Sequence, residues 1–337
     1  MSRSDLSRYV LAISAAGAML AGCGGSQPPI GAPGAIRQGL AIPTHTAHGK
    51  SWMLPEAKSE DLIYVTNGCG GVCVLTYPQG SLVGSLAVAG AGSVCADRNG
   101  NVFVTVADLS NASILEYRHG GMKPIETLSD APNVPQGCSV DPTTGNLAVA
   151  NFIGTGWGYD HGNVAIYTGA KGNGMDIHQP NIYWYYFCAY DDAGDLLVDG
   201  RSVSSGDEFA ELPPGSSQLE YVSINDDLGF PGPVGWDGAH FVIGMGGHRD
   251  NLVYRVELSG STGTIVGKTR LTGRRYRRSY YYTFWIQGHT IVVPYSTNGH
   301  HYGDDRLGLF NYPKGGEARE VIGSYNGNVA VSLPRRH

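Results

Sequence analysis

Residues 136–151 read QGCSVDPTTGNLAVAN, and they contain the clearest copy of the pattern that predicts the fold. It places a turn built on Asp141, Gly145 and Asn146 between two short apolar segments. Asp and Asn side chains hydrogen-bond to turn backbone, and Gly adopts the positive φ that tight turns need. A third apolar segment, GNVAIY, follows at 162–167, before a Gly-rich turn. The stretch therefore predicts a small antiparallel unit of four strands.

The same frame recurs along the chain with a period of about 45 residues, which is the signature of a repeat architecture. Each copy pairs an apolar segment, a turn of Asp, Gly or Asn and a second apolar segment. The copies read CADRNGNVFV at 95–104, AYDDAGDLLV at 189–198, VGWDGAHFVI at 234–243 and WIQGHTIVV at 285–293.

The first copy lacks its first strand. Residues 62–67 (LIYVTN) match the second strand of a unit, and residues 74–78 (VLTYP) match the third. The C-terminal stretch GNVAVSL, at 327–333, is a strand with no unit to follow it. One missing strand and one spare strand predict a closed ring, which removes exposed sheet edges. We therefore predict an all-β fold, a six-bladed β-propeller of four-stranded blades over residues 61–337, with the C-terminal strand completing the first blade.

The pattern resembles NHL-type six-bladed β-propellers, and more closely uncharacterised bacterial propeller lipoproteins. The resemblance rests on the phrases EYRHGG at 116–121 and DPTTGNLAV at 141–149, and it covers about residues 61–333. These motifs are specific for architecture. They say little about activity, because one propeller scaffold carries many functions.

The N-terminal segment resembles a targeting signal. Arg3 and Arg8 precede a short apolar run that ends in LAGC at 20–23, which resembles a bacterial lipobox with Cys23 as the lipidated residue. We predict a signal peptide over 1–22, a flexible Gly-, Pro- and Ala-rich tether over 23–60, and lipid anchoring on the extracytoplasmic side of the cell envelope. No later segment is long and apolar enough to predict a membrane span.

The charge and composition of the chain limit the classes of partner that we expect. The chain has 337 residues, a formal net charge of −6 and only 15% charged residues, so nucleic acid is not an expected partner. We expect a monomer that carries no cofactor.

Five cysteines follow Cys23, in a compartment that permits disulfides. Cys69 and Cys73 flank a short hairpin loop and form a candidate disulfide. Cys138 and Cys188 share one frame position on neighbouring first strands, which we expect to lie too far apart for a bridge. Together with Cys95 they are interpreted as small buried apolar residues.

No hydrolase signature is visible, since the chain has neither a Gly-x-Ser-x-Gly nor a His-Glu-x-x-His motif. Propeller lactonases hold a metal with carboxylates and amides from several blades. Here the candidate carboxylates occupy one repeated turn position, which favours a structural role and no metal site. Streptogramin-lyase-like propellers rely on a histidine at the channel mouth, and no spacing singles one out among the loop histidines. The residues concerned are Asp97, Asp141, Asp191 and Asp237, and His119, His240 and His289.

Two aromatic clusters precede first strands and are expected on one face of the ring: YWYYF at 183–187 and RRYRRSYYY at 274–282. Arginine forks pair with carboxylate or phosphate, and tyrosines favour recognition surfaces. The sequence therefore favours a binding module for an envelope protein or anionic ligand over an enzyme. The alternative is a lactonase- or lyase-type propeller with a channel-mouth site. The candidate face comprises Arg274, Arg275, Tyr276, Arg277, Arg278, Tyr280, Tyr281, Tyr183 and Trp184.

Overall fold

Almost every regular element of the structure is a short β-strand. The computed structural model describes residues 49–335 except 109, 155–160, 204–205, 227, 229–231, 245–250, 274–276, 279–282, 297–304, 324 and 326, with backbone alone at 277, 278, 296 and 305. All of these residues fall within the unit Thr44–His337. Helical structure among them is confined to two 3-10 turns, and none of the helices described could span a membrane. The turns are η2 (Pro55–Lys58) and η3 (Thr168–Ala170).

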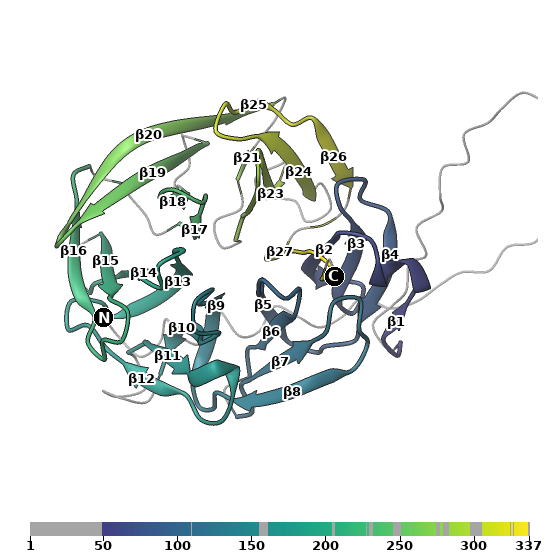
Figure 1. Ribbon diagram of the computed structural model, residues 1–337, viewed down its shortest axis with the longest axis horizontal. Helices are drawn as coiled ribbons and strands as arrows, with labels where there is room; N and C mark the ends of the chain where they lie inside the picture. Colours follow the sequence, from purple (N-terminus) through teal and green to yellow (C-terminus); the bar gives the residue numbers. More distant parts are fainter. Residues whose placement is uncertain are drawn as a thin grey trace, which may run out of the picture. The chain divides into compact units, whose positions relative to one another are not determined.

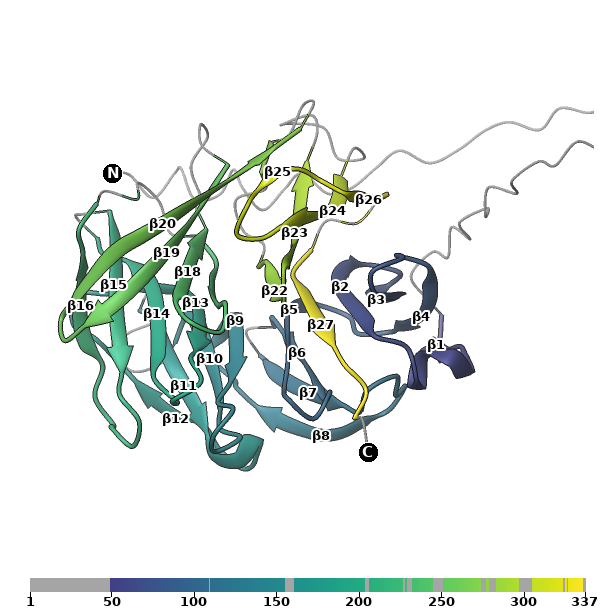
Figure 2. The same ribbon diagram turned by 45° about the horizontal axis from the view of Figure 1, so that its top comes forward.

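The first sheet joins the two ends of the folded chain. Its strand order is β1-β4-β3-β2-β27, and β27 pairs antiparallel with β2 from Val65↔Val329 to Leu62↔Ser332. Figures 1 and 2 both show β27 beside β2 on the inner side of this sheet. The predicted closure by the C-terminal strand is therefore confirmed. The strands are β1 (Trp52–Met53), β2 (Leu62–Gly68), β3 (Gly71–Thr76), β4 (Leu82–Leu86) and β27 (Val329–Ser332).

The folded part begins before Asp61. Trp52 pairs with Ser85 on the outer edge of the first sheet, and Ala57 in η2 is fully buried. Residues 52–58 belong to the folded part and not to the predicted tether, because they add an outer strand to that sheet and bury Ala57 in its core.

The next two sheets are simple antiparallel meanders of four strands. The second sheet has the order β5-β6-β7-β8, and the third has β12-β11-β10-β9. Their strands are β5 (Ala91–Ala96), β6 (Val102–Val106), β7 (Ser113–Tyr117), β8 (Pro124–Ser129), β9 (Val134–Val140), β10 (Leu147–Ile153), β11 (Asn163–Tyr167) and β12 (Met175–Ile177).

Two further meanders are joined into one sheet of nine strands. The connection is a short parallel pairing of β16 with β20, Ser223↔Thr262 and Ile224↔Gly263, made possible because β20 is 11 residues long. The strands are β13 (Trp184–Tyr190), β14 (Leu196–Arg201), β15 (Asp207–Leu212), β16 (Glu220–Ile224), β17 (Val234–Trp236), β18 (Phe241–Gly244), β19 (Leu252–Ser259), β20 (Thr262–Thr272) and β25 (Gly316–Glu317).

The last sheet has the order β21-β23-β24-β26, with β22 also paired to β23. The described residues therefore form five antiparallel-rich sheets, and the all-β, propeller-like prediction holds at that level. Six separate four-stranded blades are not clearly resolved, because the β16–β20 pairing fuses two meanders. The remaining strands are β21 (Arg277–Arg278), β22 (Trp285–Gln287), β23 (Thr290–Ser296), β24 (Asp305–Asn311) and β26 (Glu320–Gly323).

The repeated aspartates are turn residues, as their repeated place in the frame predicts. Asp97 Oδ1 accepts hydrogen bonds from the backbone N–H groups of Asn99 (2.8 Å) and Asn101 (2.7 Å). Asp191 Oδ1 accepts from the N–H of Ala193 at 2.8 Å. The same bonds recur at Asp141 and Asp237, so the carboxylates fix the turns that connect first to second strands.

Apolar side chains from adjacent sheets share each core cluster. One cluster combines Val164 of the third sheet with Cys188 and Val198 of the next sheet, all at most 4% exposed. Successive sheets therefore stack face to face around an axis (Figure 1). This stacking brings the innermost strands β27, β5, β9, β13, β17 and β22 together, each in contact with the next and β22 with β27.

Candidate functional site: the central cavity

The innermost strands surround a cavity of about 560 Å³. Side chains from β5, β9, β13, β17, β22 and β27 line it, so it lies on the axis of the ring. A cavity of this size falls in the range of small-molecule sites. The ring closure described above is what creates it, since its wall includes Val329 and Val331 of β27.

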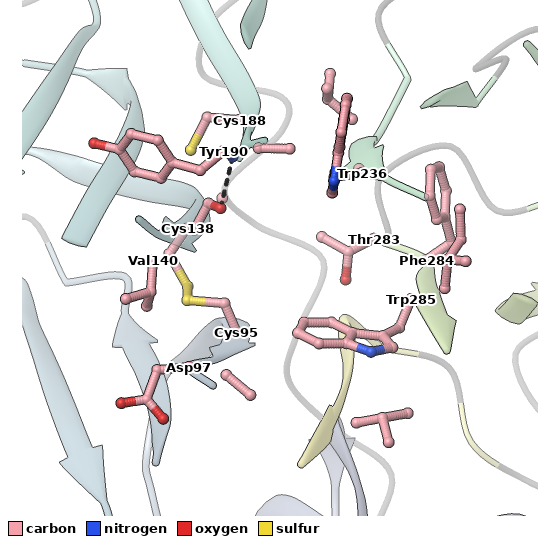
Figure 3. Close-up of a pocket in the computed structure, with 18 of the residues that line it drawn as sticks. Cys95, Asp97, Cys138, Val140, Cys188, Tyr190, Trp236, Thr283, Phe284 and Trp285 are labelled. Atoms are coloured by element: carbon pink, nitrogen blue, oxygen red, sulfur yellow. Dashed lines mark hydrogen bonds between the residues drawn. A yellow bond between two sulfur atoms is a disulfide. The ribbon is translucent and has the colours of Figure 1, made fainter. Parts of the chain in front are cut away.

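Two indoles dominate one side of the cavity. Figure 3 shows Trp236 and Trp285 on that side, opposite Cys95 and Cys138. Trp236 packs edge-to-face on Phe241, with ring centroids 5.1 Å apart, which holds the indole in place.

The two indole N–H groups differ in their partners. Trp285 Nε1 donates to Gln287 Oε1 at 3.5 Å, a long contact. Trp236 Nε1 is buried and has no acceptor among the described residues. A buried donor without an acceptor costs about 1–3 kcal/mol, so a hydrogen-bond acceptor for the Trp236 N–H would be favourable.

Charged residues gather at the end of the cavity formed by the Asp turns. Asp97, Arg98, Asp191 and Asp192 line this mouth. Arg98 pairs with Asp192, which joins the turn after β5 to the turn after β13; both side chains are at least half exposed. Because Asp97 and Asp191 each add a carboxylate, the described charges at the mouth are net negative, which disfavours anions.

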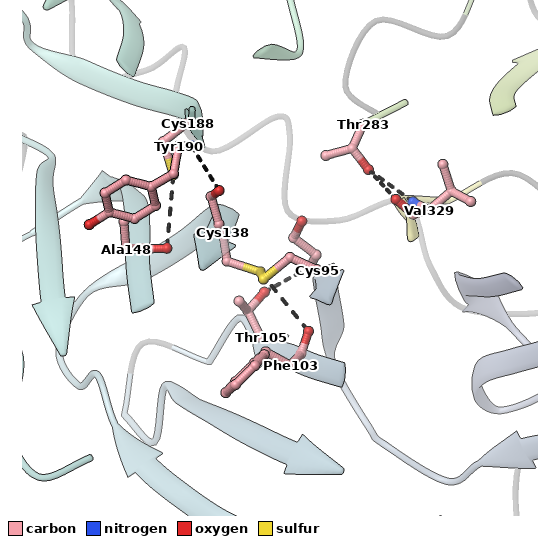
Figure 4. The surroundings of a disulfide bond; sticks show 11 residues. Cys95, Phe103, Thr105, Cys138, Ala148, Cys188, Tyr190, Thr283 and Val329 are labelled. Carbon is pink, nitrogen blue, oxygen red and sulfur yellow. Dashed lines mark hydrogen bonds between the residues drawn. A yellow bond between two sulfur atoms is a disulfide. The ribbon is translucent and has the colours of Figure 1, made fainter. Parts of the chain in front are cut away.

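A disulfide between Cys95 and Cys138 crosses two sheets beside the cavity (Figure 4). It corrects the interpretation of these two cysteines as apolar filling. Their Cα atoms lie only 5.8 Å apart, because the innermost strands β5 and β9 converge toward the axis. Cys95 stands two residues before its turn aspartate and Cys138 stands three residues before its own. A bridge between neighbouring sheets is thus possible where the two positions in the repeat differ by one residue.

The remaining cysteines differ from one another. Cys69 and Cys73 form a disulfide with Cα atoms 5.2 Å apart, in the hairpin between β2 and β3. Cys188 is the free cysteine of the described residues and is 4% exposed. Burial raises the pKa of its thiol to about 12, so it stays protonated at neutral pH.

The predicted aromatic and arginine face is only partly described. Tyr183 and Trp184 are half-buried and contact each other, with ring centroids 4.6 Å apart. The backbone of Arg277 and Arg278 forms β21, which pairs with the last residues of β23. Both segments lie at the strand ends away from the Asp turns, on different sheets. The residues Arg274, Arg275, Tyr276, Tyr280 and Tyr281 lie outside the described residues, as does Cys23.

Among the described residues no group of three or more His, Cys, Asp or Glu side chains is placed to hold a metal ion. His119 has a structural contact: Nδ1 lies 2.7 Å from Ser332 Oγ and Nε2 lies 2.9 Å from the Glu60 carbonyl. Burial lowers the pKa of His119, and its ring ties β27 to the segment before β2.

Sequence reasoning missed the two cavity tryptophans and the Cys95–Cys138 bridge. Trp236 precedes the turn aspartate, where the other copies carry Ala96, Val140 and Tyr190, so no shared motif marks it. Trp285 begins its strand and has no tryptophan at the matching place of another copy. The sequence shows that Cys95 and Cys138 differ by one residue in their position in the repeat. The distance between the innermost strands cannot be predicted from the sequence.

Comparison with known proteins identifies the fold and no family. No protein-family model matches the chain, and no curated protein is significantly similar to it. A chain from the crystal structure of a nidogen/laminin complex superposes with a TM-score of 0.59 at 12% identity, covering 82% of this chain and 100% of that one. A protein of unknown function from Bacteroides caccae superposes with a TM-score of 0.57 at 13% identity, covering 81% of this chain and 99% of that one. These similarities support a β-propeller fold.

Proposed function

We propose that the chain is a ligand-binding β-propeller whose central cavity takes an uncharged, ring-shaped ligand of the saccharide class. The observation that carries the proposal is the buried N–H of Trp236 beside a 560 Å³ cavity, which has no acceptor among the residues that the structure describes. A ligand oxygen there would give this N–H the acceptor that those residues do not supply.

The chemistry of the wall supports this ligand class. A saccharide ring offers C–H faces that pack against indoles such as Trp285, and hydroxyl oxygens that accept from N–H donors. Gln287 lines the same cavity and supplies a further polar group, whereas the Thr283 hydroxyl is hydrogen-bonded to the backbone of Val329. The net negative mouth counts against anionic ligands in the cavity itself.

Six blades are the arrangement that best explains the strand order. In this proposal β13–β16 and β17–β20 are separate blades whose outer strands touch, because β16 and β20 share only two paired positions. The Asp turn between first and second strands, repeated at Asp97, Asp141, Asp191 and Asp237, supports an NHL-like repeat.

The proposed location is the bacterial cell envelope. Lipidation of Cys23, with removal of residues 1–22, would anchor the chain, and residues 24–50 would act as the tether, since Ser51 accepts a hydrogen bond from the Ala87 N–H. A flexible segment of that length reaches about 30 Å on average, which keeps the propeller near the membrane surface. The Arg274–Tyr282 segment then offers a second, basic surface for an anionic envelope partner, with Tyr183 and Trp184 on the same face.

Tryptophan fluorescence tests the cavity proposal. Neutral mono- and disaccharides are titrated into the protein and into Trp236→Phe, which keeps the ring but removes the N–H donor. Trp52→Phe, on the outer strand β1, is the matched control. We expect saturable quenching that weakens about tenfold in Trp236→Phe and is unchanged in the control. Absence of any response across the panel, or equal affinity in both variants, would overturn the proposal.

A further inference from the structure

A buried polar network links the end of the second sheet to the third sheet, away from the central cavity. Asn133 Nδ2 donates to Asp130 Oδ1 at 3.2 Å, and Asn163 Nδ2 donates to Asn133 Oδ1 at 3.0 Å. Asn151 Nδ2 donates to Asn163 Oδ1 at 2.8 Å. The Tyr167 hydroxyl lies 2.7 Å from Asp130 Oδ1. Asp130, Asn133, Asn151 and Asn163 are at most 4% exposed.

Two oxygen atoms in this network lack a donor at hydrogen-bond distance. Asp130 Oδ2 and Asn151 Oδ1 are buried without such a partner among the described residues, and the Asn151 side chain lies close enough to the Asp130 carboxyl to lower its pKa. The exposed fractions of the two residues are 3% and 0%. Buried acceptors are almost always satisfied, so this pair calls for a missing partner. Both atoms are acceptors, and the partner must therefore be a proton donor or a cation.

A second carboxylate stands at the edge of the network. Asp176 on β12 is exposed, and its negative charge contributes to the raised pKa of Asp130, after the larger effect of burial. Two carboxylates that repel each other beside amide oxygens form the donor set that Ca²⁺ prefers. Asp176 also provides the route from solvent, because the other members are enclosed.

We propose that Asp130 and Asn151 bind one Ca²⁺ ion through these two free oxygens, with Asp176 as the outer carboxylate. The ion would cancel the repulsion between the two carboxylates and fasten the connection between β8 and β9 to the third sheet. The remaining coordination positions would be filled by water. This site is independent of the proposed ligand cavity.

Terbium is a direct probe, because Tb³⁺ occupies calcium sites and its emission is excited by a nearby tyrosine. Tyr167 touches Asp130 and is placed to excite it. We expect saturable Tb³⁺ emission from the full chain that CaCl₂ displaces and that falls in Tyr167→Phe. We also expect a higher melting temperature in CaCl₂ than in EDTA, with a smaller increase in MgCl₂.

Three variants decide the assignment. Asp130→Asn should weaken Ca²⁺ binding at least tenfold, while Asp226→Asn, an exposed carboxylate paired with Lys268, should not. Asn151→Asp adds a carboxylate to the site and should tighten Ca²⁺ binding at least tenfold while lowering the melting temperature in EDTA. If Asp130→Asn fails to fold, Asn151→Asp still tests the site by a gain. Identical melting in CaCl₂ and EDTA without Tb³⁺ emission, or Ca²⁺ affinity unchanged in Asn151→Asp, would overturn it and leave water or a proton as the partner.

Discussion

Ser139→Cys should form a second disulfide between neighbouring sheets, with Cys188. In strand register, Cys95 stands opposite Phe103, and Cys138 Sγ lies 4.0 Å from the Phe103 carbonyl oxygen. One sheet further on, Ser139 stands opposite Ala148, and Cys188 Sγ lies 3.9 Å from the Ala148 carbonyl oxygen. Ser139 therefore occupies the place relative to Cys188 that Cys95 occupies relative to Cys138.

The expected gain follows from the length of the closed loop. Bridging residues 139 and 188 closes about 50 residues, which the chain-entropy model values at about 4 kcal/mol. Ser139 Oγ now accepts from the Tyr190 N–H at 3.0 Å, and losing that bond costs about 1 kcal/mol. The net stabilisation of about 3 kcal/mol corresponds to an increase of about 6 °C in melting temperature.

The assay is a thiol count in denaturant together with melting under oxidising and reducing conditions. In Ser139→Cys the Cys188 thiol should become unreactive, and the increase in melting temperature should vanish with reductant. Ser139→Ala, which cannot form the bridge, should keep a reactive Cys188 thiol. Two reactive thiols, at positions 139 and 188, in the folded and oxidised variant would refute the equivalence of the sheets.

Three further predictions follow from other parts of the molecule. A chain truncated after Gly323 loses β27, whose residues are at most 2% exposed, and should lose cooperative melting. The hydrogen bonds and packing of that strand contribute nearly the whole free energy of unfolding of about 5–15 kcal/mol. An unchanged melting curve would rule out the closure. Burial raises the pKa of Asp130 to about 6 from 3.8. In EDTA the ionisation of Asp130 therefore lowers the free energy of unfolding by about 3 kcal/mol above pH 6, and that free energy should rise as the pH falls toward 4. Asp130→Asn should remove that rise, as judged by denaturant unfolding at several pH values, and an identical pH dependence in the variant would contradict it. Replacing the four arginines of the basic segment by Ser should weaken binding of a polyanion such as heparin, most at low salt, and equal binding at both salt concentrations would make the segment a mere solubilising loop. The four positions are Arg274, Arg275, Arg277 and Arg278.

Much of the fold could be predicted because each copy of the repeat contains a turn with the same residue types at the same places. The turn at Asp141 needs a carboxylate and a glycine at fixed places, so its copies are visible along the chain. The pairing of 327–333 with the first sheet followed from counting strands. The joining of two meanders into one sheet could not be predicted from the sequence, because the β16–β20 pairing depends on how far β20 extends beyond its own hairpin.

The sites were harder to predict, because they depend on distances between segments that are far apart in sequence. Asp130 lies in the connection after β8 and Asn151 lies on β10, and no spacing marks them as neighbours. Trp236 and Trp285 line one cavity only because the ring closes. Trp52 falls within the predicted tether because that segment shows no sustained periodicity, and a strand of two residues adds none. The arginine face stays a prediction, since most of it lies outside the described residues.

A crystal structure of the chain soaked with the tightest-binding neutral saccharide would show whether the cavity is the binding site. We predict a sugar ring in the central cavity, stacked on Trp285, with an oxygen of the sugar accepting a hydrogen bond from Trp236 Nε1. A cavity that holds only water while the sugar binds elsewhere, or binds nowhere, would contradict it.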